Sequence, residues 1–493
     1  MKSKMFKKLM AGVLTMTMTA GLAACGGGSN ESSDVAGSAS SESKESQSSE
    51  ATPASTDAST SEEEASPYPI LKDANGNVYD LGGMEIVIRD WWTDPDAPKV
   101  DQGAYAEAQD EWREWIQETY NFKITQKAIS GWGEVPQDFT DYVTQGGDDN
   151  NYVFILREDA SLTSQIAKGM CYDLATLDCL DFNSEMLSVS GTSDMYKKGN
   201  SIYAMYAGPS EPRGGVFFNK RLLEEIGMTA DELYDLQKNK QWTWDKMEEI
   251  MAKVQRDIDG DGVYDVFGCN CNNGGLISCA IYSNGGRVVG KDASGKFYYA
   301  LEEPQTLRAM EWADHIYKTY WETPDEAWDQ YKDSFCNGKY LFMFEEAWAG
   351  QANSFVPTMT DDWGFLMFPM GPDVNDYIMK ASNNPTVIPG CYDADRAWKI
   401  AFAWNLYNET VPGFEGEDDA WQAGYLQTYD TRAINETLGV MRMKGVGQIE
   451  NIIPDLDMTK ILWNVGPNGA KPSELVEQVR DVYKAAIDAA NNQ

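Results

Sequence analysis

The sequence predicts an α/β protein in which strands alternate with crossover helices. Three observations lead to this class. The segment 84–89 has the alternation and β-branching of a strand. The segment 104–120 carries large apolar residues at helical spacing. The segment 152–156 is a nearly continuous apolar run, as expected of a strand that is buried on both faces. Strands and helices in this order favour a sheet with crossover helices.

The remaining elements follow from local patterns of the same kind. A second strand is predicted over 122–129, and a helix over 161–170. A new unit begins with a strand near 214–220, which runs directly into a helix that stops at Gly227. Thr243 has the side chain of an N-cap and opens another helix. Further helices are predicted over 301–320, 331–335, 394–408 and 473–489.

Length and charge narrow the class of function. The chain has 493 residues, enough for two domains of ordinary size, and a net charge of −38. Such an acidic balance argues against nucleic acid and against adhesion to anionic lipid, because both depend on basic surface. The single histidine, His315, falls on a predicted helix, where a packed or solvated role is expected. Nucleophilic systems that need a histidine base are therefore disfavoured.

The N-terminus has the features of an export signal. Four lysines precede an apolar stretch over 9–20, which is too short to span a bilayer, and small residues then lead to Cys25. Leu22-Ala23-Ala24-Cys25 resembles the bacterial lipobox, in which the cysteine is acylated and the leader removed. We expect residues 1–25 to be a lipoprotein signal peptide with palmitate-type chains on Cys25. An ordinary signal peptide cleaved nearby is the alternative.

A polar segment follows the signal. Residues 26–66 consist mainly of Gly, Ser, Glu, Ala and Thr, and hold no aromatic side chain. Such a composition buries too little apolar surface to offset its ordering entropy, so we expect a disordered spacer. A flexible chain of this length reaches roughly 35 Å, which would lift a domain off a membrane.

The cysteines leave several arrangements open. The chain has eight, and if Cys25 carries lipid an odd number remains. Cys171 and Cys179 could form a disulfide, as could two of Cys269, Cys271 and Cys279, but sequence alone does not fix the connectivity. Zinc is a poor interpretation, because paired two-residue spacings are missing.

One acidic loop has the spacing of a calcium site. Carboxylates stand at loop positions one, three, five and nine, with a glycine at six, and position seven would offer a backbone carbonyl. The twelfth position is Gly268, so the usual bidentate glutamate is missing. No cofactor is required, but a weak structural Ca²⁺ is one interpretation and a plain acidic turn is the other. The candidate ligands are Asp257, Asp259, Asp261, Val263 and Asp265.

Five segments occur in the order of a known family. They are a strand, a helix and a G-x-x-x-D-L pattern over 151–174, the strand-to-helix step at 218–223, the helix start at 242–245, the Asn-Gly-Gly loop at 284–286, and the F-x-x-G-K pattern over 335–343. Together they resemble the extracellular solute-binding lipoproteins of carbohydrate-type ABC importers, the family related to maltose-binding protein. The chain departs from the family at Phe342-Met343, where Ala-Met is usual, and 411–460 matches no family segment.

The resemblance implies two α/β lobes that are joined by hinge strands and close on a ligand in the cleft between them. It implies an N-terminal lobe over 67–211 with part of 364–410, and a C-terminal lobe over 212–345 with part of 411–493. Ligands of open α/β sheets bind beyond the carboxyl ends of strands. The loops after Ile88 and Leu156, and after a strand expected before Asn284, should therefore face the ligand.

The same resemblance implies a function without catalysis. A monomeric, lipid-anchored protein on the extracellular face would capture a sugar or oligosaccharide and deliver it to the permease subunits of an ABC importer. Two alternatives stay open. One is a surface glycan-binding lipoprotein that feeds no transporter, and the other is a tethered glycoside hydrolase that uses two carboxylates. A uronate is also an open choice of ligand.

A sugar site needs aromatic platforms for the apolar faces of the rings and polar groups for the hydroxyls. The candidates lie in predicted loops and hinges, because the tryptophans at helical spacing are expected in the core. A salt bridge at the hinge and a simple turn at the Asn-Gly-Gly loop are the structural alternatives for three of them. The predicted ligand-binding residues are Trp91, Trp92, Asp94, Trp132, Arg157, Asp159, Glu211, Arg213, Asn284, Trp348 and Trp463.

Overall fold

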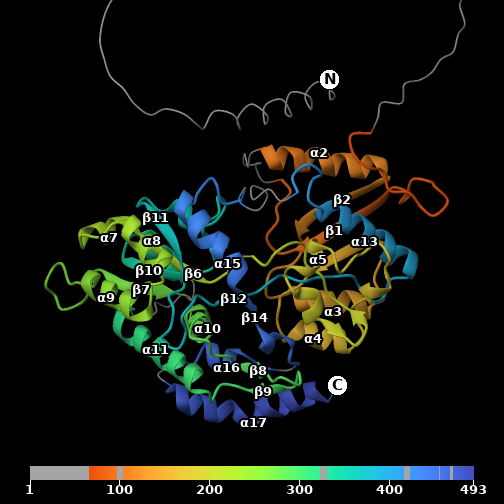
Figure 1. The fold of residues 1–493 in the computed structure, drawn as a ribbon. Coiled ribbons are helices and arrows are strands. Elements are labelled where there is room, and N and C mark those ends of the chain that lie inside the picture. Colours follow the sequence, from red (N-terminus) through yellow and green to blue (C-terminus); the bar gives the residue numbers. More distant parts are fainter. Residues whose placement is uncertain are drawn as a thin grey trace, which may run out of the picture. The chain divides into compact units, whose positions relative to one another are not determined.

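The computed structural model describes residues 66–96, 104–211, 213–271, 273–321, 330–415, 422, 424–454, 456–466 and 470–492. The predicted signal peptide, Cys25 and the spacer up to residue 65 lie outside the described residues. Residues 66–493 form one compact unit. Within this unit, two sheets define two α/β lobes, which are called the N-lobe and the C-lobe below (Figure 1).

The N-lobe is built on a four-stranded sheet with the order β13-β3-β1-β2. β1 (Met84–Asp90) lies parallel to β2 (Phe122–Ala128) and to β3 (Asn151–Ile155), whereas β13 (Thr386–Val387) is antiparallel to β3. The three parallel strands match the segments that the sequence predicted. The antiparallel edge strand comes from far along the chain and has only two residues, too few for a sequence pattern to reveal.

Helices cover this sheet and complete its core. Ile86 and Ile88 of the central strand β1 are buried, and each contributes about 1.5–3 kcal/mol. The helices and turns of the N-lobe are α2 (Ala104–Thr119), α3 (Val135–Thr144), α4 (Ala160–Ala167), η1 (Leu174–Thr176), α5 (Glu185–Ser188), α6 (Thr192–Met195) and α13 (Ala394–Asn408), together with the hairpin of β4 (Lys197–Lys198) and β5 (Ser201–Ile202). The predicted helices over 104–120, 161–170 and 394–408 are confirmed to within a few residues.

The C-lobe has a mixed sheet with the order β11-β6-β10-β7. β6 (Gly215–Asn219) is antiparallel to both β10 (Tyr340–Glu345) and β11 (Trp363–Met367), while β7 (Phe267–Cys271) runs parallel to β10. All the residues of β6, β7 and β10 are buried. This explains the mostly apolar character of β6 and β10 in the sequence, because the sheet is covered on both faces.

Local capping sets the beginnings of several C-lobe helices. Asn219 ends β6 and caps α7 (Lys220–Glu225) by accepting the backbone N–H of Leu222 at 3.1 Å. Thr243 caps α9 (Trp244–Val254), as predicted. The other elements are α8 (Ala230–Lys238), α10 (Asn273–Ser283), β8 (Val289–Lys291), β9 (Phe297–Tyr299), α11 (Pro304–Tyr320), α12 (Gln330–Cys336), η2 (Ala347–Gly350), η3 (Val356–Thr358) and β12 (Met379–Ala381).

The C-terminal part of the chain packs on the core of the C-lobe. Its elements are the π-helix η4 (Ala433–Leu438), α15 (Gly439–Lys444), β14 (Gly445–Gly447), η5 (Ile449–Ile452), α16 (Thr459–Leu462) and α17 (Pro472–Asn491). Leu475, Val479 and Tyr483 place the apolar face of α17 in this core, which confirms the predicted amphipathic helix. The lobe boundaries expected from the sequence remain a prediction.

Candidate functional site

Two adjacent tryptophans follow β1 at the carboxyl edge of the N-lobe sheet. Their ring centroids lie 4.8 Å apart at 79°, which is an edge-on contact. Trp91 is partly buried against the N-lobe core, whereas Trp92 is 50% exposed. This is the expected arrangement for neighbours at a strand end, with one side chain packed and the other presented to solvent.

Asp90 holds this tryptophan loop in place. Its carboxylate is fully buried and accepts hydrogen bonds from the backbone N–H groups of Trp92 (3.2 Å) and Thr93 (3.0 Å) and from the Gln126 amide (2.8 Å). Sequence reasoning missed Asp90, which ends the observed strand β1 one residue beyond the predicted segment 84–89. The neighbouring candidate Asp94 is exposed and accepts the backbone N–H of Asp96 at 3.0 Å.

A second exposed tryptophan stands in the loop between β2 and α3. Trp132 is 60% exposed, and the guanidinium carbon of Arg157 lies 3.9 Å from its ring centroid. Arg157 Nε also donates to Asp159 at 2.8 Å, and Asp159 caps α4 by accepting the backbone N–H of Ser161 at 2.9 Å. The structure therefore brings three predicted residues together. Arg157 backs one face of the ring while its own charge is neutralised by Asp159.

Trp348 is the corresponding exposed aromatic side chain of the C-lobe. It lies on η2, directly after β10, and is 39% exposed. Its indole N–H donates to Glu346 Oε2 at 3.1 Å, and its ring meets Phe355 edge-on at 6.0 Å. A carboxylate on one side and a ring on the other fix the orientation of the indole.

Glu346 belongs to a charged cluster that is centred on the predicted hinge residue Arg213. Arg213 is 8% exposed, and its guanidinium reaches Glu346 at 3.1 Å, Glu211 at 3.3 Å and the carbonyl of Ser382 at 2.8 Å. Lys380 lies 3.7 Å from Glu346. The Glu211–Arg213 pair is thus the hinge salt bridge that the sequence left as an alternative, and it leaves Glu211 about half exposed.

Burial and neighbouring charges together set the pKa values of the acids in this cluster. Burial opposes ionisation of Glu346, but Arg213 and Lys380 outweigh it and hold the pKa of that carboxyl below its ordinary value. Burial raises the pKa of the neighbouring Glu345, and the charge of Glu346 adds to this rise. Glu345 also accepts the hydroxyl of Tyr331. Glu345, Glu346 and Lys380 were not predicted as site residues, because their grouping depends on long-range contacts.

Two predicted residues lie elsewhere in the C-lobe. Asn284 follows the helix α10, not a strand, so the expected strand before it is wrong. Its side chain is fully buried and donates to Gln305 O and Asp373 Oδ2, and its oxygen accepts Asp373 N–H. These contacts give Asn284 a structural role. Trp463 ends α16, which packs against α10 and α17.

Exposure separates the candidate tryptophans from the core ones. Within the described ranges, the tryptophans that rank as exposed are Trp92, Trp132, Trp348 and Trp463, and all four were predicted to contact ligand. The predicted core residues Trp112 and Trp115 do pack in the N-lobe core. Hydrophobic periodicity therefore distinguished packed from presented aromatic residues.

The acidic loop folds around its own carboxylates. Asp257, Asp259 and Asp265 each offer an oxygen within 4.8 Å of the others. Asp257 accepts the N–H groups of Gly262 and Gly260, which lower the pKa of this partly buried residue's carboxyl. Asp261 and Val263 lie in the same loop, where Asp261 accepts the N–H of Val263 at 2.8 Å. Three acids thus meet with a geometry that suits a hard cation.

The cysteines of the described residues form no disulfide, and the histidine lies at the surface. All seven cysteines after residue 66 are free. Neither suggested disulfide is present. Cys171 packs in one apolar cluster while Cys179 donates to Trp398 O, and Cys269, Cys271 and Cys279 are free thiols in the C-lobe core. His315 lies on α11, half exposed beside Glu248 at 2.7 Å, as predicted for a solvated helix residue.

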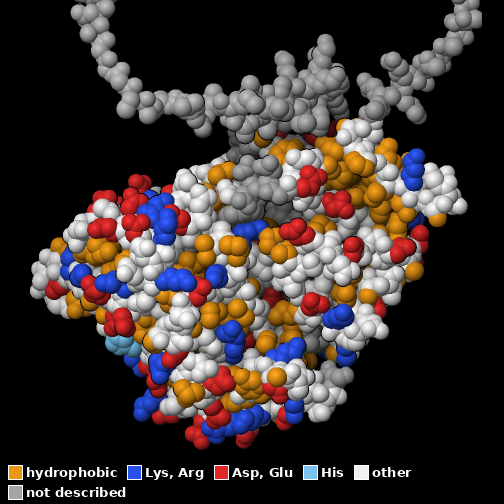
Figure 2. Space-filling model, in the orientation of Figure 1, with side chains coloured by type: hydrophobic (Ala, Val, Ile, Leu, Met, Phe, Trp, Pro, Cys, Tyr) orange, Lys and Arg blue, Asp and Glu red, His pale blue; other side chains and the backbone are white. Residues whose placement is uncertain are grey.

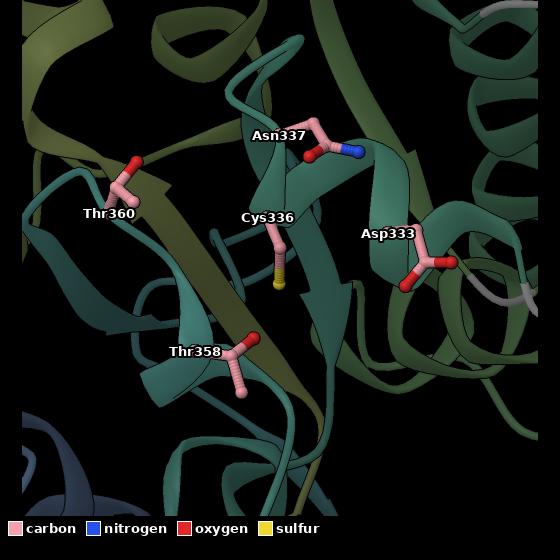
Figure 3. Close-up of a pocket in the computed structure, with 5 residues that line it drawn as sticks. All are labelled: Asp333, Cys336, Asn337, Thr358 and Thr360. Carbon is pink, nitrogen blue, oxygen red and sulfur yellow. The ribbon is translucent and has the colours of Figure 1, made fainter.

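A polar cavity of about 390 Å³ lies on the C-lobe, between the end of α12 and η3 (Figure 3). The Cys336 sulfur points into it. Its lining residues are Asp333, Cys336, Asn337, Thr358 and Thr360. None of them is a predicted ligand contact.

The fold is two-lobed and periplasmic-binding-protein-like. Similar solved structures include the GacH receptor of Streptomyces glaucescens, determined without ligand and with acarbose (13% identity, TM-score 0.57, covering 82% of this chain and 99% of that one). Another is the ABC substrate-binding protein Lmo0181 of Listeria monocytogenes in complex with cycloalternan (16%, 0.57, 83% and 98%).

A third similar structure is UgpB of Mycobacterium tuberculosis in complex with glycerophosphocholine (16%, 0.56, 83% and 99%). No described protein family and no curated protein matches the sequence. At these identities the comparisons establish the fold, and they confirm the two-lobed α/β class that the sequence predicted.

Figure 2 shows basic and acidic side chains interspersed over the visible face of the described residues, without a continuous basic patch. Among the helices described, none combines the length and apolar character needed to cross a bilayer.

Proposed function

We propose that this chain is the substrate-binding protein of an ABC importer and captures a sugar or oligosaccharide between its two lobes. The observation that carries the proposal is the placement of exposed tryptophans on both lobes. Trp92 and Trp132 lie at the carboxyl edge of the N-lobe sheet, and Trp348 follows a strand of the C-lobe sheet. Exposed aromatic rings beside carboxylates suit the apolar faces and hydroxyl edges of sugars. The acarbose and cycloalternan complexes of similar proteins support this ligand class.

The charges around these rings favour a neutral ligand over a uronate. Arg157 is paired with Asp159, and Arg213 is paired with Glu211 and Glu346. A ligand carboxylate would therefore have to compete with carboxylates that are already in place, and Glu211 would repel it. Because the similar protein UgpB was solved in complex with glycerophosphocholine, the ligands to be tested should include polar solutes other than sugars.

The proposal includes a membrane tether and a transport partner. Acyl chains on Cys25 would anchor the chain to the extracellular face of the membrane, since each buried methylene contributes about 0.8 kcal/mol. The chain would act as a monomer, and the spacer would let its two lobes reach the permease subunits. Closure on the ligand shifts an equilibrium between open and closed lobes and involves no catalysis.

We further propose that the loop of Asp257, Asp259 and Asp265 takes a Ca²⁺ ion, with Asp261 and the Val263 carbonyl as additional oxygen donors. The convergence of three carboxylates supports the site, and the glycine at position twelve makes it weak. Affinity in the range of about 10⁻⁴–10⁻³ M is expected, as in extracellular calcium modules. The ion would stiffen the loop and would not contact the sugar.

Thermal unfolding against a panel of mono- and oligosaccharides, with and without calcium, tests the main proposal. A ligand that binds only the native state raises the midpoint by mass action. We expect a rise for one class of sugar, with the sugar recovered unchanged. Cleaved sugar would instead support the glycoside hydrolase, and an unshifted midpoint across the panel would contradict the sugar assignment. Uptake of the same sugar in cells with and without this protein separates an importer from a surface glycan binder.

A further inference from the structure

The short helix η5 (Ile449–Ile452) lies at the seam between the two lobes. Ile449 and the adjacent Ile453 pack with the C-lobe core, whereas Ile452 packs with an N-lobe cluster that includes Leu156 and Leu162. A single turn of chain therefore has apolar contacts in both lobes. Any separation of the lobes must break one of these two sets of contacts.

Polar contacts tie the same turn to the N-lobe. Asn451 Nδ2 donates to Glu158 Oε1 at 3.4 Å, and Thr163 Oγ1 donates to the carbonyl of Asn451 at 3.2 Å. Glu158 Oε2 also accepts the backbone N–H of Asn383 at 2.6 Å, on the segment that crosses from β12 to β13. Glu158 directly precedes Asp159, the cap of α4, so it belongs to the N-lobe side of the seam.

The other side of the turn is tied to the C-lobe. The hydroxyl of Tyr282, on α10, lies 2.9 Å from both carboxylate oxygens of Glu450. Tyr282 and Glu450 are 1% and 2% exposed, so this pair is shielded from water. The seam thus brings together two carboxylates, Glu450 on the turn itself and Glu158 on the N-lobe.

We propose that Glu158, Thr163, Tyr282, Glu450 and Asn451 form an interlobe latch, and that this latch loosens as the pH rises toward neutrality. The latch goes beyond the proposed ligand site and depends on the proposed function only in that both require the lobes to move apart.

The pH dependence follows from the groups that face Glu158. Burial raises the pKa of its carboxyl to about 7, and the charge of Glu450 adds to this rise, whereas the Asn383 N–H, Asn451 and Arg213 oppose it. The phenols of Tyr196 and Tyr282 lie in the same environment. Burial also raises the pKa of Glu450, against Tyr282, Arg287 and Lys380.

Hydrogen bonds and burial act on Glu158 in opposite directions. Its two carboxyl oxygens accept the backbone N–H of Asn383 and the amide of Asn451, and these contacts favour the ionised form. Burial outweighs them, so the joined state favours the protonated carboxyl.

The sign of the effect is fixed by the two pKa values of Glu158. Below its ordinary pKa of 4.5, the carboxyl is neutral whether the lobes are joined or parted. Between 4.5 and about 7, ionisation stabilises only the parted state, in which water reaches the carboxylate. Latch strength is thus full at low pH, falls across this window and is constant above it.

A distance measurement on the full chain tests the latch. Spin labels are attached to p-acetylphenylalanine at Lys168, after α4, and at Glu311, on α11, since both side chains are exposed and the native cysteines then stay unmodified. Cys25→Ser keeps the chain free of lipid. Without ligand, the ratio of long to short distances should rise on the order of a hundredfold from pH 4.5 to pH 8. An unchanged distribution would overturn the proposal.

Two variants assign the effect to Glu158. Glu158→Gln, which imitates the neutral carboxyl, should keep the short distance at both pH values. Glu409→Gln is the matched control, because Glu409 is an N-lobe carboxyl whose pKa burial also raises, bonded to Asn405 of the adjacent α13. It should retain the wild-type response. A pH response that persists in Glu158→Gln would contradict the latch, and the sugar titration at fixed pH reports separately on the proposed function.

Discussion

Arg157 and Trp132 form a stacked pair at the edge of the N-lobe sheet, with the guanidinium carbon 3.9 Å from the indole centroid. A cation over a ring contributes about 0.5–1 kcal/mol at an exposed site. Because Asp159 orients the guanidinium from the other side, the ring stands in a fixed direction although it is 60% exposed. Such an indole can meet a sugar without first losing much rotational freedom.

Removing the side chain of Trp132 or of Arg157 should weaken ligand binding. We expect Trp132→Ala to raise the Kd of the sugar found in the thermal panel by about tenfold, through loss of a stacking surface. Arg157→Ala should raise it less, because the ring remains but is no longer held. Calorimetric titration measures both. Val482→Ala, an exposed position on α17, is the control and should bind as the wild type does.

Ligand charge should matter in a defined direction. With Arg157 and Arg213 both paired, a uronate analogue should bind at least about tenfold more weakly than the neutral sugar of the same linkage. Calorimetric titration of the uronate analogue and of the neutral sugar, each at low and at moderate salt, measures the two Kd values. Tighter binding of the uronate would show that the acidic partners move aside, and would contradict the charge argument.

Glu346 should support stability near neutral pH and lose this effect in acid. Its lowered pKa means that the ionised carboxyl stabilises the native state above the ordinary value of 4.5, and that this contribution disappears as the pH falls through the native pKa. Glu346→Gln should therefore cost about 2–3 kcal/mol of unfolding free energy at pH 7, since Arg213 loses a buried partner. The cost should shrink toward pH 3.

Urea unfolding at several pH values measures the Glu346 effect. Glu249→Gln is the comparison, because Glu249 has a pKa lowered to about 2 by Lys246 and Lys253 but lies at the surface. Water and salt screen such a pair, so its loss should change stability little. An equal loss in both variants would mean that burial of the Arg213 cluster contributes nothing.

Calcium should raise the thermal midpoint at millimolar concentration, and a chelator should lower it again. Asp257→Asn and Asp259→Asn should each abolish the rise. Asp149→Asn, on an exposed loop of the N-lobe, should preserve it. Isothermal titration with the metal alone provides the affinity. A rise that survives both loop substitutions would place the ion elsewhere.

The sequence predicted local structure well because local forces decide it. Periodic apolar residues defined β1 and α17, and Thr243 was identified as a cap because its hydroxyl needs only the next turn of chain. Exposed tryptophans were found for a similar reason, since they lie outside any helical stripe. Packing of Trp112 follows from the same rule.

Long-range contacts were not predictable in the same way. Asn284 was placed after a strand because its loop motif carries no information about the element before it. Glu158, Asn383 and Glu450 meet from three distant segments, and nothing in the local pattern of any one indicates the other two. The strand β13 has only two residues, and only its pairing with β3 identifies it as a strand.

The pairing of β13 with β3 also has a consequence for how the protein is made. β6, β7, β10 and β11 all lie between these two strands in the sequence, so every strand of the C-lobe sheet leaves the ribosome before the N-lobe sheet gains its fourth strand. α13, which supplies Ile400 and Ala401 to the N-lobe core, follows later still. Contacts between such distant segments form slowly. The N-lobe sheet, although three of its strands are translated first, is therefore completed only after every strand of the C-lobe sheet has been made.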